Sequence, residues 1–498
     1  MDRLRKFIHK NRVEVIVVAL IAILTLGLRL YKIDGFMTFL GDEGRDVRIV
    51  RNILRGDLAF IGPQTSIGNM YLGPLYYYMM APALFIWGLN PVGPAVMVAF
   101  LGAITVLFTW WVGRTWFNPL AGIIAACLFA LAPVAIIYSR SSWNPNPMPF
   151  FALLCIWGIW QVYRFERWRW LPIVGISLAF ALQMHYLGLL LIPPLVVYWF
   201  LALKRGNSTM RRQGAVQTAI AIGLFLFLMS PLVLFDLKHD FANLTAFRQF
   251  LTDRQTTVNL NPGRSDRFLP VIFKITDDLV LGSTAWQVEA AAAILVGLTA
   301  VVLFKDRRQP ALKILLVWLG FAWLGLSLYK QHVYAHYFGF IFPAVYLLLG
   351  LIFSFFWRRS LVAKILSASA VLLIAGLFIS NSPLRFSPNN QLARTKEAVS
   401  ELIAASEGKE FNFGLIAKQN YDESYRYFFE QLQAPLVRGE DKLTDQLFVI
   451  CEDGDACQPL NNPAYQIAIF GPATIESEWR LDYLHLYKLG HTLLYNSK

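Results

Sequence analysis

Charged residues are scarce in this chain of 498 amino acids, and their scarcity excludes the commonest class of protein. Only 15% of the residues are charged, whereas 56% are hydrophobic; soluble proteins carry about 25% charged residues. The chain also lacks a Walker motif and the glycine fingerprint of dinucleotide-binding folds, which argues against ATP and soluble dinucleotides. Internal repeats and low-complexity segments are not found. A single soluble domain, a disordered chain and a collagen are therefore excluded.

The apolar residues that dominate the chain are grouped into blocks of membrane-spanning length. A helix needs about 20 mainly apolar residues to cross the hydrocarbon core of a bilayer. The sequence predicts 11 such helices, the first of them an uncleaved span rather than a signal peptide because no small-residue cleavage site follows it. The predicted spans are residues 15–28, 94–112, 120–138, 147–163, 171–185, 187–203, 214–235, 286–304, 310–328, 337–357 and 361–380.

Basic residues outnumber acidic ones, and their distribution indicates membrane topology rather than nucleic-acid binding. The net charge is +13, but residues from Ser387 onward contribute −6 and the rest contributes +19. The basic excess lies in short clusters between apolar blocks, which is the positive-inside pattern of a multi-span membrane protein. We therefore predict a multi-pass protein of the plasma membrane, with a cytoplasmic amino terminus and residues 381–498 outside the cytoplasm.

Residues 73–89 form an apolar segment that does not fit the alternation of spans. The segment is short, and Pro74 and Pro82 interrupt it. A full crossing here would place every later basic cluster on the outer side, so we predict a re-entrant or interfacial segment, with 12 spans as the alternative. Irregular backbone at membrane depth is tolerated only beside protein or a wet cavity. The segment should therefore border a site.

The sequence predicts two domains, a membrane domain over residues 1–385 and a small extracytoplasmic α/β domain over residues 386–498. Strands are expected at residues 410–417, 446–452, 466–470 and 488–495, and a helix at residues 422–432. Cys451 and Cys457 stand six residues apart on either side of a glycine turn. We predict a disulfide between them, because an extracytoplasmic domain permits one.

An acidic pair, Asp42 and Glu43, lies just after the first span. The following helix is expected to be amphipathic, with Arg48, Arg51 and Arg55 on its polar face at the level of the lipid phosphates. Two interpretations remain open. The acids cap the helix, or one of them is a general base at the membrane surface. Arg45, one turn further on, then pairs with a phosphate or keeps the carboxylate ionised.

This arrangement resembles the GT-C superfamily of polytopic membrane glycosyltransferases. The resemblance rests on one span, then Asp42-Glu43 and Arg45 on an outer helix, then Gly73-Pro74-Leu75-Tyr76-Tyr77. The branch that it resembles contains the bacterial protein-mannosyltransferase-like and aminoarabinose-transferase-like enzymes. The resemblance extends in architecture from residue 15 to about residue 380. It implies a mainly α, GT-C-like membrane fold followed by the small α/β domain.

The resemblance also implies a reaction. Enzymes of this kind move a sugar from a polyprenyl-phosphate donor to an extracytoplasmic acceptor, usually with inversion, and the acceptor is a lipid, a glycan or a protein. The first acid of the pair is the base in this family, a position that Asp42 occupies, and Glu43 is the second choice. The lysine that often precedes the Pro-Pro-Leu segment is missing, since Leu72-Gly73-Pro74-Leu75 stands there.

Several polar or aromatic residues at the outer ends of the spans are candidate substrate ligands. Each also has a purely structural interpretation. The asparagines of a proline-rich turn bond their own backbone, and a lone histidine at a span end is commonly an interfacial residue. Lys330 is the best substitute for the missing phosphate-binding lysine, and His336-Tyr337 stands where relatives often have Arg-Tyr. The predicted substrate-binding residues are Arg45, Tyr76, Arg140, Asn144, His185, Lys330, His336 and Tyr337.

No cofactor is predicted with certainty. His332 and His336 have a spacing that could share a divalent metal, but no third ligand is identifiable. The expected partners are the lipid-linked donor, the acceptor and membrane lipids, with no nucleic acid. The alternative function is a transporter or flippase, but transporters place ionisable residues near mid-membrane, where this chain has almost none.

Overall fold

The computed structural model describes residues 9–65, 70–252, 266–284, 287–329, 331–454 and 457–492. The chain divides into two units: unit 1 consists of residues 1–31 and 57–387, and unit 2 of residues 32–56 and 388–498. Residues 32–56, which include the acidic pair, thus belong with the C-terminal domain. The sequence interpretation had assigned them to the membrane domain.

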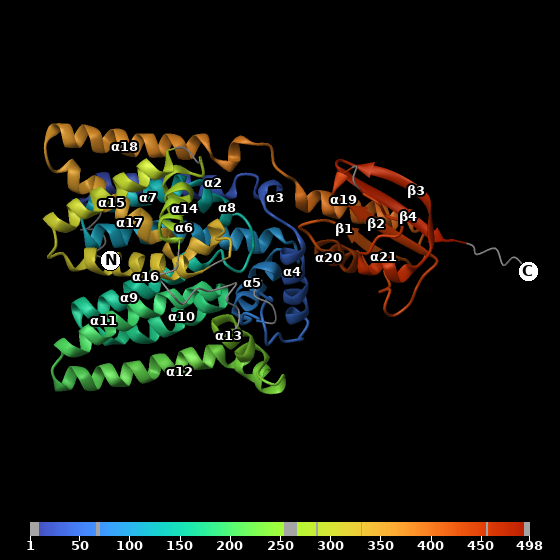
Figure 1. Ribbon diagram of the computed structural model, residues 1–498, viewed down its shortest axis with the longest axis horizontal. Coiled ribbons are helices and arrows are strands. Elements are labelled where there is room, and N and C mark those ends of the chain that lie inside the picture. Colours follow the sequence, from blue (N-terminus) through green and yellow to red (C-terminus); the bar gives the residue numbers. More distant parts are fainter. Residues whose placement is uncertain are drawn as a thin grey trace, which may run out of the picture. The chain divides into compact units, whose positions relative to one another are not determined.

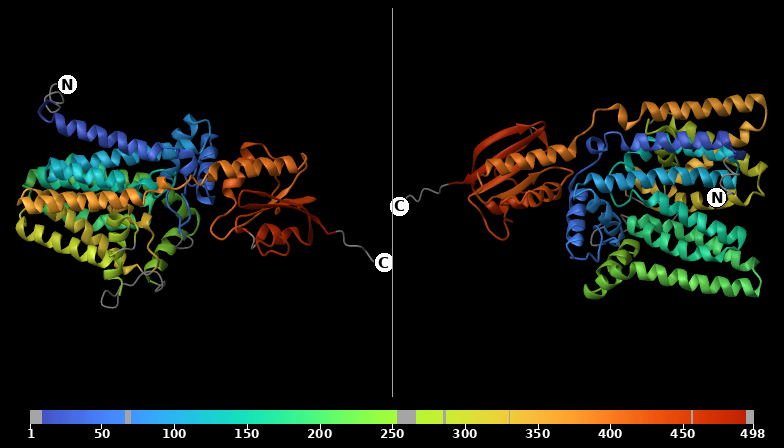
Figure 2. Two further views of the ribbon diagram at one scale, coloured as in Figure 1. Left: turned by 90° about the horizontal axis from the view of Figure 1, so that it is seen from above. Right: turned by 180° about the vertical axis from the view of Figure 1, so that it is seen from behind.

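Unit 1 is a bundle of long apolar helices that run side by side (Figures 1 and 2). Nine helical segments of the described residues are long and apolar enough to cross a membrane, by length and composition. Two of the nine include a preceding 3-10 turn, η2 (Tyr186–Leu191) before α11 and η5 (Ala335–Ile341) before α17. The long helices are α2 (Arg12–Leu30), α6 (Val92–Trp116), α9 (Met148–Phe165), α11 (Ile192–Arg205), α12 (Ser208–Lys238), α15 (Val288–Lys305), α16 (Pro310–Leu328), α17 (Phe342–Trp357) and α18 (Leu361–Ser380).

The core of the bundle surrounds α17, whose residues are almost all buried. Helices α12, α15 and α18 are mostly exposed although they are strongly apolar. An apolar helix with an exposed surface is stable where lipid rather than water surrounds it. The burial pattern therefore agrees with a bundle in a membrane, with α17 at its centre and these three helices at its edge.

All 11 predicted spans overlap helices, although proline residues divide or delay several of them. The span predicted at residues 120–138 is divided into α7 (Pro119–Leu131) and α8 (Pro133–Tyr138), because Pro133 has no N–H group to continue the first helix. The span predicted at residues 171–185 is α10 (Leu171–Met184), which follows η1 (Trp168–Trp170). Prolines at the starts of α11 and α17 likewise mark where the 3-10 turns η2 and η5 give way to regular helix.

The segment predicted to be re-entrant or interfacial contains α5 (Leu75–Ile86). Twelve residues at 1.5 Å each give about 18 Å, which is too short to cross about 30 Å of hydrocarbon. Gly88 and Leu89 adopt positive φ angles and turn the chain directly into α6. The remaining helices of unit 1 are α13 (Ala242–Thr252), α14 (Phe268–Thr276), the π-helical turn η4 (Asp277–Leu281) and η6 (Pro383–Arg385).

Unit 2 contains a four-stranded sheet in the order β1-β2-β4-β3. Strands β1 (Asn412–Ile416) and β2 (Gln446–Cys451) are parallel and are joined through α20 (Glu423–Gln431), whereas β4 (Leu484–His491) is antiparallel to β2 and to β3 (Ala473–Leu481). All six residues of β2 are buried. A strand buried on both sides needs a cover on each face of the sheet.

Helices provide these two covers. Phe411 and Phe413 contact Phe429 of α20 on one face, where α19 (Gln391–Ala405) packs beside α20. On the other face, α21 (Tyr465–Phe470) places Ile467 and Phe470 in a core with alternate residues of β2 and β4. The α/β nature of the C-terminal domain, predicted from the sequence, is confirmed.

The strand predicted at residues 466–470 is wrong, because this segment is the helix α21. A short apolar run fits either a buried strand or a buried helix, and periodicity cannot separate the two. Helical spacing brings Ile467 and Phe470 to one face, where they cover the sheet. The adjoining β3, with its largely exposed surface, has too few apolar residues to be predicted as a strand.

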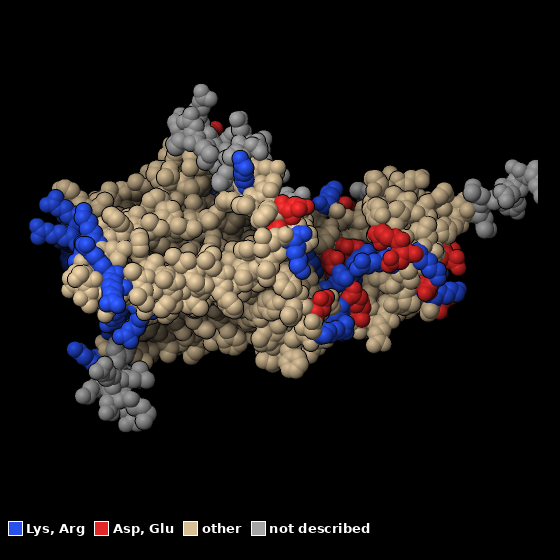
Figure 3. Space-filling view, turned by 90° about the horizontal axis from the view of Figure 1, so that it is seen from below, with Lys and Arg blue, Asp and Glu red and all other residues tan. Residues whose placement is uncertain are grey.

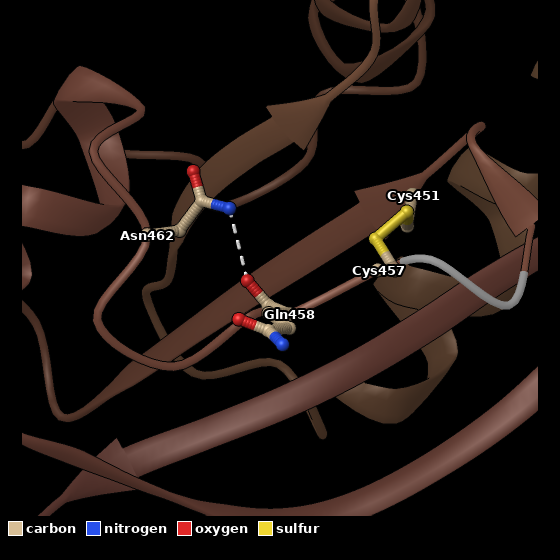
Figure 4. The surroundings of a disulfide bond; sticks show 4 residues. All are labelled: Cys451, Cys457, Gln458 and Asn462. Atoms are coloured by element: carbon tan, nitrogen blue, oxygen red, sulfur yellow. Dashed lines mark hydrogen bonds between the residues drawn. A yellow bond between two sulfur atoms is a disulfide. The ribbon is translucent and has the colours of Figure 1, made fainter.

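Cys451 and Cys457 are joined by a disulfide at the end of β2 (Figure 4). Their Cα atoms are 6.2 Å apart, within the range for such a bond. Just beyond Cys457, the Asn462 amide donates to the carbonyl oxygen of Gln458 at 2.9 Å and closes the following turn. Cys127 and Cys155 are free thiols in unit 1.

Residues 32–56 pack against the helices of the C-terminal domain as an integral part of unit 2. They form α3 (Ile33–Phe36) and α4 (Gly41–Leu54). The Asn390 N–H donates to the carbonyl oxygen of Gly35 at 2.8 Å, and the Phe39 N–H donates to Gln391 Oε1 at 3.1 Å. The ring of Phe39 also contacts Phe428, with centroids 5.6 Å apart.

Candidate functional site

Helix α4 begins at the acidic pair, and Glu43 closes its first turn. Leu40 is extended, and its N–H donates to Glu43 Oε2 at 3.0 Å. Four N–H groups at a helix start have no partner within the helix, and a side-chain oxygen three residues on can satisfy the cap residue. Glu43 is only 5% exposed, and this burial raises its pKa to about 7. Glu43 thus caps the helix, as one of the two sequence interpretations expects.

Asp42 has a different environment, although it is the adjacent residue. Its side chain is 41% exposed. Its Oδ1 atom accepts hydrogen bonds from Arg45 Nη1 at 2.8 Å and from the hydroxyl group of Tyr421 at 2.6 Å. Among the described residues, no hydrogen bond reaches the second oxygen, Oδ2. The carboxylate is therefore held at one oxygen and leaves the other available to a ligand.

Arg45 lies between two carboxylates. Its Nη2 atom contacts the buried Asp46 at 2.7 Å, while Nη1 contacts Asp42. A guanidinium with both neighbours ionised is already neutralised. These two ion pairs of Arg45 are with carboxylates of its own helix, so of the two roles predicted for Arg45 the geometry favours the pairing with Asp42 over the pairing with a phosphate.

The polar face of α4 does not lie free at a lipid surface, which corrects the prediction for Arg48 and Arg51. Arg48 forms ion pairs with Glu423 and with Glu430, the latter at 2.8 Å, and Arg51 also pairs with Glu430. Arg51 is only 3% exposed and lies over the ring of Tyr427. The helix is amphipathic as predicted, but its arginines bind α20, a helix about 375 residues further along the chain.

In unit 1, the start of α5 is held by a buried glutamine that sequence reasoning missed. Gln183 Oε1 accepts from the Leu75 N–H at 3.2 Å, and its Nε2 atom donates to the carbonyl oxygen of Leu228 at 2.9 Å. A Cβ atom on Gly73 would lie 2.0 Å from Gln183 Oε1, so any larger residue there would displace the buried glutamine. Tyr76, on the first turn of α5, is fully buried and bonds Ser142 through its hydroxyl group at 2.7 Å.

The loop at residues 139–147 is a buried polar segment whose side chains mainly bond backbone. Asn144 Nδ2 donates to the carbonyl oxygen of Met184 at 2.7 Å. Arg140 donates to the carbonyl oxygens of Leu28 and Tyr31, at the C-terminal end of α2. These carbonyls have no partner within the helix, so Arg140 caps it. The bonds of Arg140 and Asn144 hold the loop in place.

His185, His336 and Tyr337, three of the predicted ligands, lie together in an aromatic cluster. We define the aromatic cluster as Trp143, His185, Tyr186, His336 and Tyr337. The ring centroid of His336 lies 4.5 Å from that of Trp143, and the centroid of His185 lies 4.8 Å from that of Tyr337.

The 3-10 turns η2 and η5 contact each other and bring these residues together, since η2 begins directly after His185 and η5 begins directly before His336. Tyr186 and Tyr329 also join their hydroxyl groups at 3.1 Å, a contact between residues 143 positions apart that the sequence does not indicate.

The aromatic cluster and the basic residues occupy opposite ends of the same helices. Lys204 and Arg205 end α11, whereas His185 and Tyr186 precede its start; Arg358 follows the end of α17, whereas His336 precedes its start. Lysine and arginine side chains gather at one end of the bundle of unit 1 (Figure 3). This separation is the one that the charge pattern of the sequence predicts.

Two further predictions concern Lys330 and a metal. Lys330 lies outside the described residues. Among the residues that the structure does describe, no three histidine, cysteine or acidic side chains gather in a way that could hold a metal ion. The ring of His332 packs against Tyr334, with centroids 4.5 Å apart. The ring of His336 instead packs against Trp143 within the aromatic cluster.

Comparisons with known proteins bear on both units. Residues 72–234, about a third of the chain, match the family model described as dolichyl-phosphate-mannose-protein mannosyltransferase. A comparison with curated protein sequences finds no match.

Solved structures give broader coverage. The structure of ArnT from Cupriavidus metallidurans bound to undecaprenyl phosphate is similar with a TM-score of 0.62 and 14% identity, over 95% of this chain and 97% of that one. The oligosaccharyltransferase of Archaeoglobus fulgidus in its apo form is similar with a TM-score of 0.53 and 15% identity, over 84% of this chain and 64% of that one. The mycobacterial arabinofuranosyltransferase AftD is similar with a TM-score of 0.51 and 13% identity, over 97% of this chain and 42% of that one. Likeness at this level of identity establishes a shared fold.

Proposed function

We propose, from the premise that the chain is a polytopic membrane protein with the fold of the GT-C glycosyltransferases, that it transfers a sugar from a polyprenyl-phosphate donor to an extracytoplasmic acceptor. The observation that carries this proposal is the likeness to ArnT, a structure bound to undecaprenyl phosphate, over nearly the whole of both chains. The match to the mannosyltransferase family over residues 72–234 supports the same class of donor.

Asp42 is the general base of the proposed reaction. An acceptor hydroxyl or amine gives its proton to the carboxylate while its oxygen or nitrogen forms a bond to the anomeric carbon. The bond from that carbon to the phosphate oxygen breaks, and the electron pair leaves with the polyprenyl phosphate. A single displacement of this kind inverts the anomeric configuration. The exposed side chain of Asp42, fixed at Oδ1 by two donors, suits a base that must meet an incoming acceptor.

Glu43 serves a different purpose in this proposal, although it is the sequence-based second choice for the base. Its carboxyl group is buried and bonded to the Leu40 N–H. A base must come within hydrogen-bond reach of the proton that it removes. We expect Glu43 to hold the start of α4 and thereby to keep Asp42 in place.

The aromatic cluster is the proposed contact surface for the sugar. Small-molecule sites are lined mainly by apolar and aromatic side chains with a few placed polar groups. Trp143, His336 and Tyr337 provide aromatic surface, and the loop at residues 139–147 adds polar groups. Arg45 is engaged by acids, so Lys330 stays the predicted partner of the donor phosphate.

Orientation in the membrane is also part of the proposal. The basic ends of the helices face the cytoplasm, so the aromatic cluster and the C-terminal domain face outward. A reporter enzyme that is active only in the cytoplasm, fused after Lys498, should be silent, and the same reporter placed in the basic loop at residues 206–207 should be active. Activity of the first fusion would contradict the orientation.

The test of the reaction needs neither the sugar nor the acceptor to be identified. Purified full-length protein is mixed with membrane lipids and an envelope fraction from cells that lack the gene, and free polyprenyl phosphate is measured by mass spectrometry. The Asp42→Asn variant should release it about 10²-fold more slowly, the usual scale for a lost general base. Asp34→Asn, which changes an exposed acid of the same segment, should match the wild type, and Glu43→Gln should be impaired less than Asp42→Asn.

Two outcomes would reject the proposal. Release at the wild-type rate by Asp42→Asn would remove this residue from the mechanism. The absence of release by the wild type, together with movement of a lipid-linked substrate across the membrane, would favour the transporter or flippase.

A further inference from the structure

The C-terminal domain contributes a side chain to the immediate surroundings of Asp42. The hydroxyl group of Tyr421 donates to Asp42 Oδ1 at 2.6 Å, and it accepts from Arg45 Nη1 at 2.9 Å. Arg45 Nη1 also donates to the same Oδ1 atom at 2.8 Å. The three groups form a closed triangle in which two donors hold one carboxylate oxygen.

The ring of Tyr421 lies against the first residue of α4, where a glycine leaves room for it. A Cβ atom on Gly41 would lie 2.5 Å from the ring of Tyr421, so any side chain at position 41 would displace the tyrosine. The Gly41 N–H, one of those without a partner within the helix, donates to Asn420 Oδ1 at 2.8 Å. Asn420 and Tyr421 therefore bind the start of α4 as a pair.

This pair is anchored to the sheet of unit 2. Asn420 Nδ2 donates to Glu452 Oε1 at 2.8 Å, and the hydroxyl group of Tyr425 donates to the same oxygen at 2.7 Å. Glu452 directly follows β2, and its N–H donates to the carbonyl oxygen of Ile416 at the end of β1. The position of the Tyr421 hydroxyl group is thus set by the framework of the domain.

The packing of the two helices allows little freedom between them. A Cβ atom on Gly44 would lie 2.3 Å from the backbone nitrogen of Ser424, so α4 and α20 meet without an intervening side chain. The ion pairs of Arg48 and Arg51 with the acids of α20 extend this contact over two further turns. Asp42 at the start of α4 and Tyr421, just before α20, are consequently held by the same pair of packed helices.

Granted the role proposed for Asp42, we infer that Tyr421 is a positioning residue that the C-terminal domain adds to the transferase site. Its hydroxyl group and Arg45 hold Oδ1, which directs Oδ2 to the acceptor. The domain is then a part of the catalytic apparatus rather than an appendage. A tyrosine ionises only at about pH 10, so the phenol of Tyr421 is protonated at neutral pH and remains a donor.

The test compares Tyr421→Phe with Asp42→Asn and with the double variant, in the assay that follows release of polyprenyl phosphate. Tyr421→Phe keeps the ring on Gly41 and removes only the donor. It should lower turnover about tenfold, the scale of one charge-assisted hydrogen bond, and leave the concentration of donor lipid at half-maximal rate unchanged. The control Tyr483→Phe removes a tyrosine hydroxyl group of the same domain that bonds Arg394 and should behave as the wild type.

The double variant separates positioning from a merely structural role. If Tyr421 acts only through the Asp42 carboxylate, Tyr421→Phe should cause no further loss once Asp42 is Asn, because the coupled effects do not add. Multiplied losses, or wild-type turnover of Tyr421→Phe beside an impaired Asp42→Asn, would overturn the inference and leave the proposed function intact. Wild-type turnover of Asp42→Asn would instead reject the proposed function.

Discussion

The two units use polar side chains in different ways at their candidate functional regions. In unit 2, charges on α4 are matched by charges from a distant part of the chain, as in the pairs of Arg48 and Arg51 with Glu430. In unit 1, the candidates around the aromatic cluster bond backbone carbonyls or uncharged hydroxyl groups, as Asn144 and Tyr186 do. Placing an ionised group inside a membrane-embedded bundle costs free energy, whereas the same group beside water stays hydrated. The ion pairs around the proposed base thus lie in unit 2, and the aromatic cluster lies in unit 1.

The contrast assigns distinct tasks to the two regions. Proton removal needs an ionised carboxylate, and α4 provides one that is held by a tyrosine and an arginine. Holding a sugar needs shape and aromatic surface, which the rings of Trp143 and Tyr337 provide. Neither region contains both a carboxylate held by a tyrosine and an arginine and the aromatic rings of the cluster. Because the proposed base lies in unit 2, disturbing the docking of α4 on α20 should lower turnover more than a comparable change within a span.

A pair of glycine substitutions tests this difference, and the first should have the largest effect. Gly44→Ala places a Cβ atom 2.3 Å from backbone atoms of Ser424, which cannot move aside as a flexible side chain can. We expect the docking of α4 on α20 to weaken by about 3 kcal/mol, the upper range for overpacking, and turnover to fall with it. Hydrogen exchange of the peptide over residues 41–54 measures the first effect, and release of polyprenyl phosphate the second.

The matched control is Gly27→Ala in α2, where a Cβ atom would meet nothing within 4 Å. Alanine is intrinsically better than glycine in a helix by about 1 kcal/mol, so both variants would be neutral or stabilising if packing did not matter. Normal protection of residues 41–54 in Gly44→Ala would contradict the backbone contact between α4 and α20.

The sequence predicts the membrane domain well because a span has a strong and local signal. Each block of about 20 apolar residues overlaps a helix in the structure, and the short segment with Pro82 is the short helix α5. The fold that the resemblance to the GT-C superfamily implies is confirmed. The C-terminal domain was predicted less completely, since α19 and β3 were not foreseen and α21 was expected to be a strand. Its elements are short and their patterns weak, so tertiary packing decides between helix and strand.

Sequence reasoning predicts Asp42 as the base but could not find which residues hold its side chain. Tyr421 lies 379 positions away from Asp42, and no local pattern connects the two. The same limit applies to Arg48 and Arg51, whose spacing on a helix indicates a polar face equally well at a lipid surface and against a second helix. Gly41 and Gly44 are the local trace of the docking, because Gly41 leaves room for the ring of Tyr421 and Gly44 for the backbone of Ser424. Without the structure, these glycines are indistinguishable from helix-terminal residues.

The smallest expected effect concerns Glu43 and depends on pH. Burial raises its pKa to about 7 in the folded chain, from the ordinary value of 4.5. A carboxyl group with a raised pKa binds its proton more tightly when the chain is folded. The folded state is therefore favoured fully below pH 4.5 and loses this contribution as the pH rises through 7.

The wild type should therefore lose on the order of 2 kcal/mol of stability in unit 2 between pH 5 and 8, since each pKa unit is worth about 1.4 kcal/mol. Glu43→Gln keeps an oxygen for the Leu40 N–H and cannot ionise, so this decline should be absent from the variant and should appear as a pH-dependent difference in stability between the wild type and the variant. Glu407→Gln, at an exposed position of the same unit, should follow the wild type across the range. If the free energy of unfolding changes with pH in the same way in the wild type and in Glu43→Gln, Glu43 is ionised in the folded chain. Its burial at the start of α4 would then not raise its pKa.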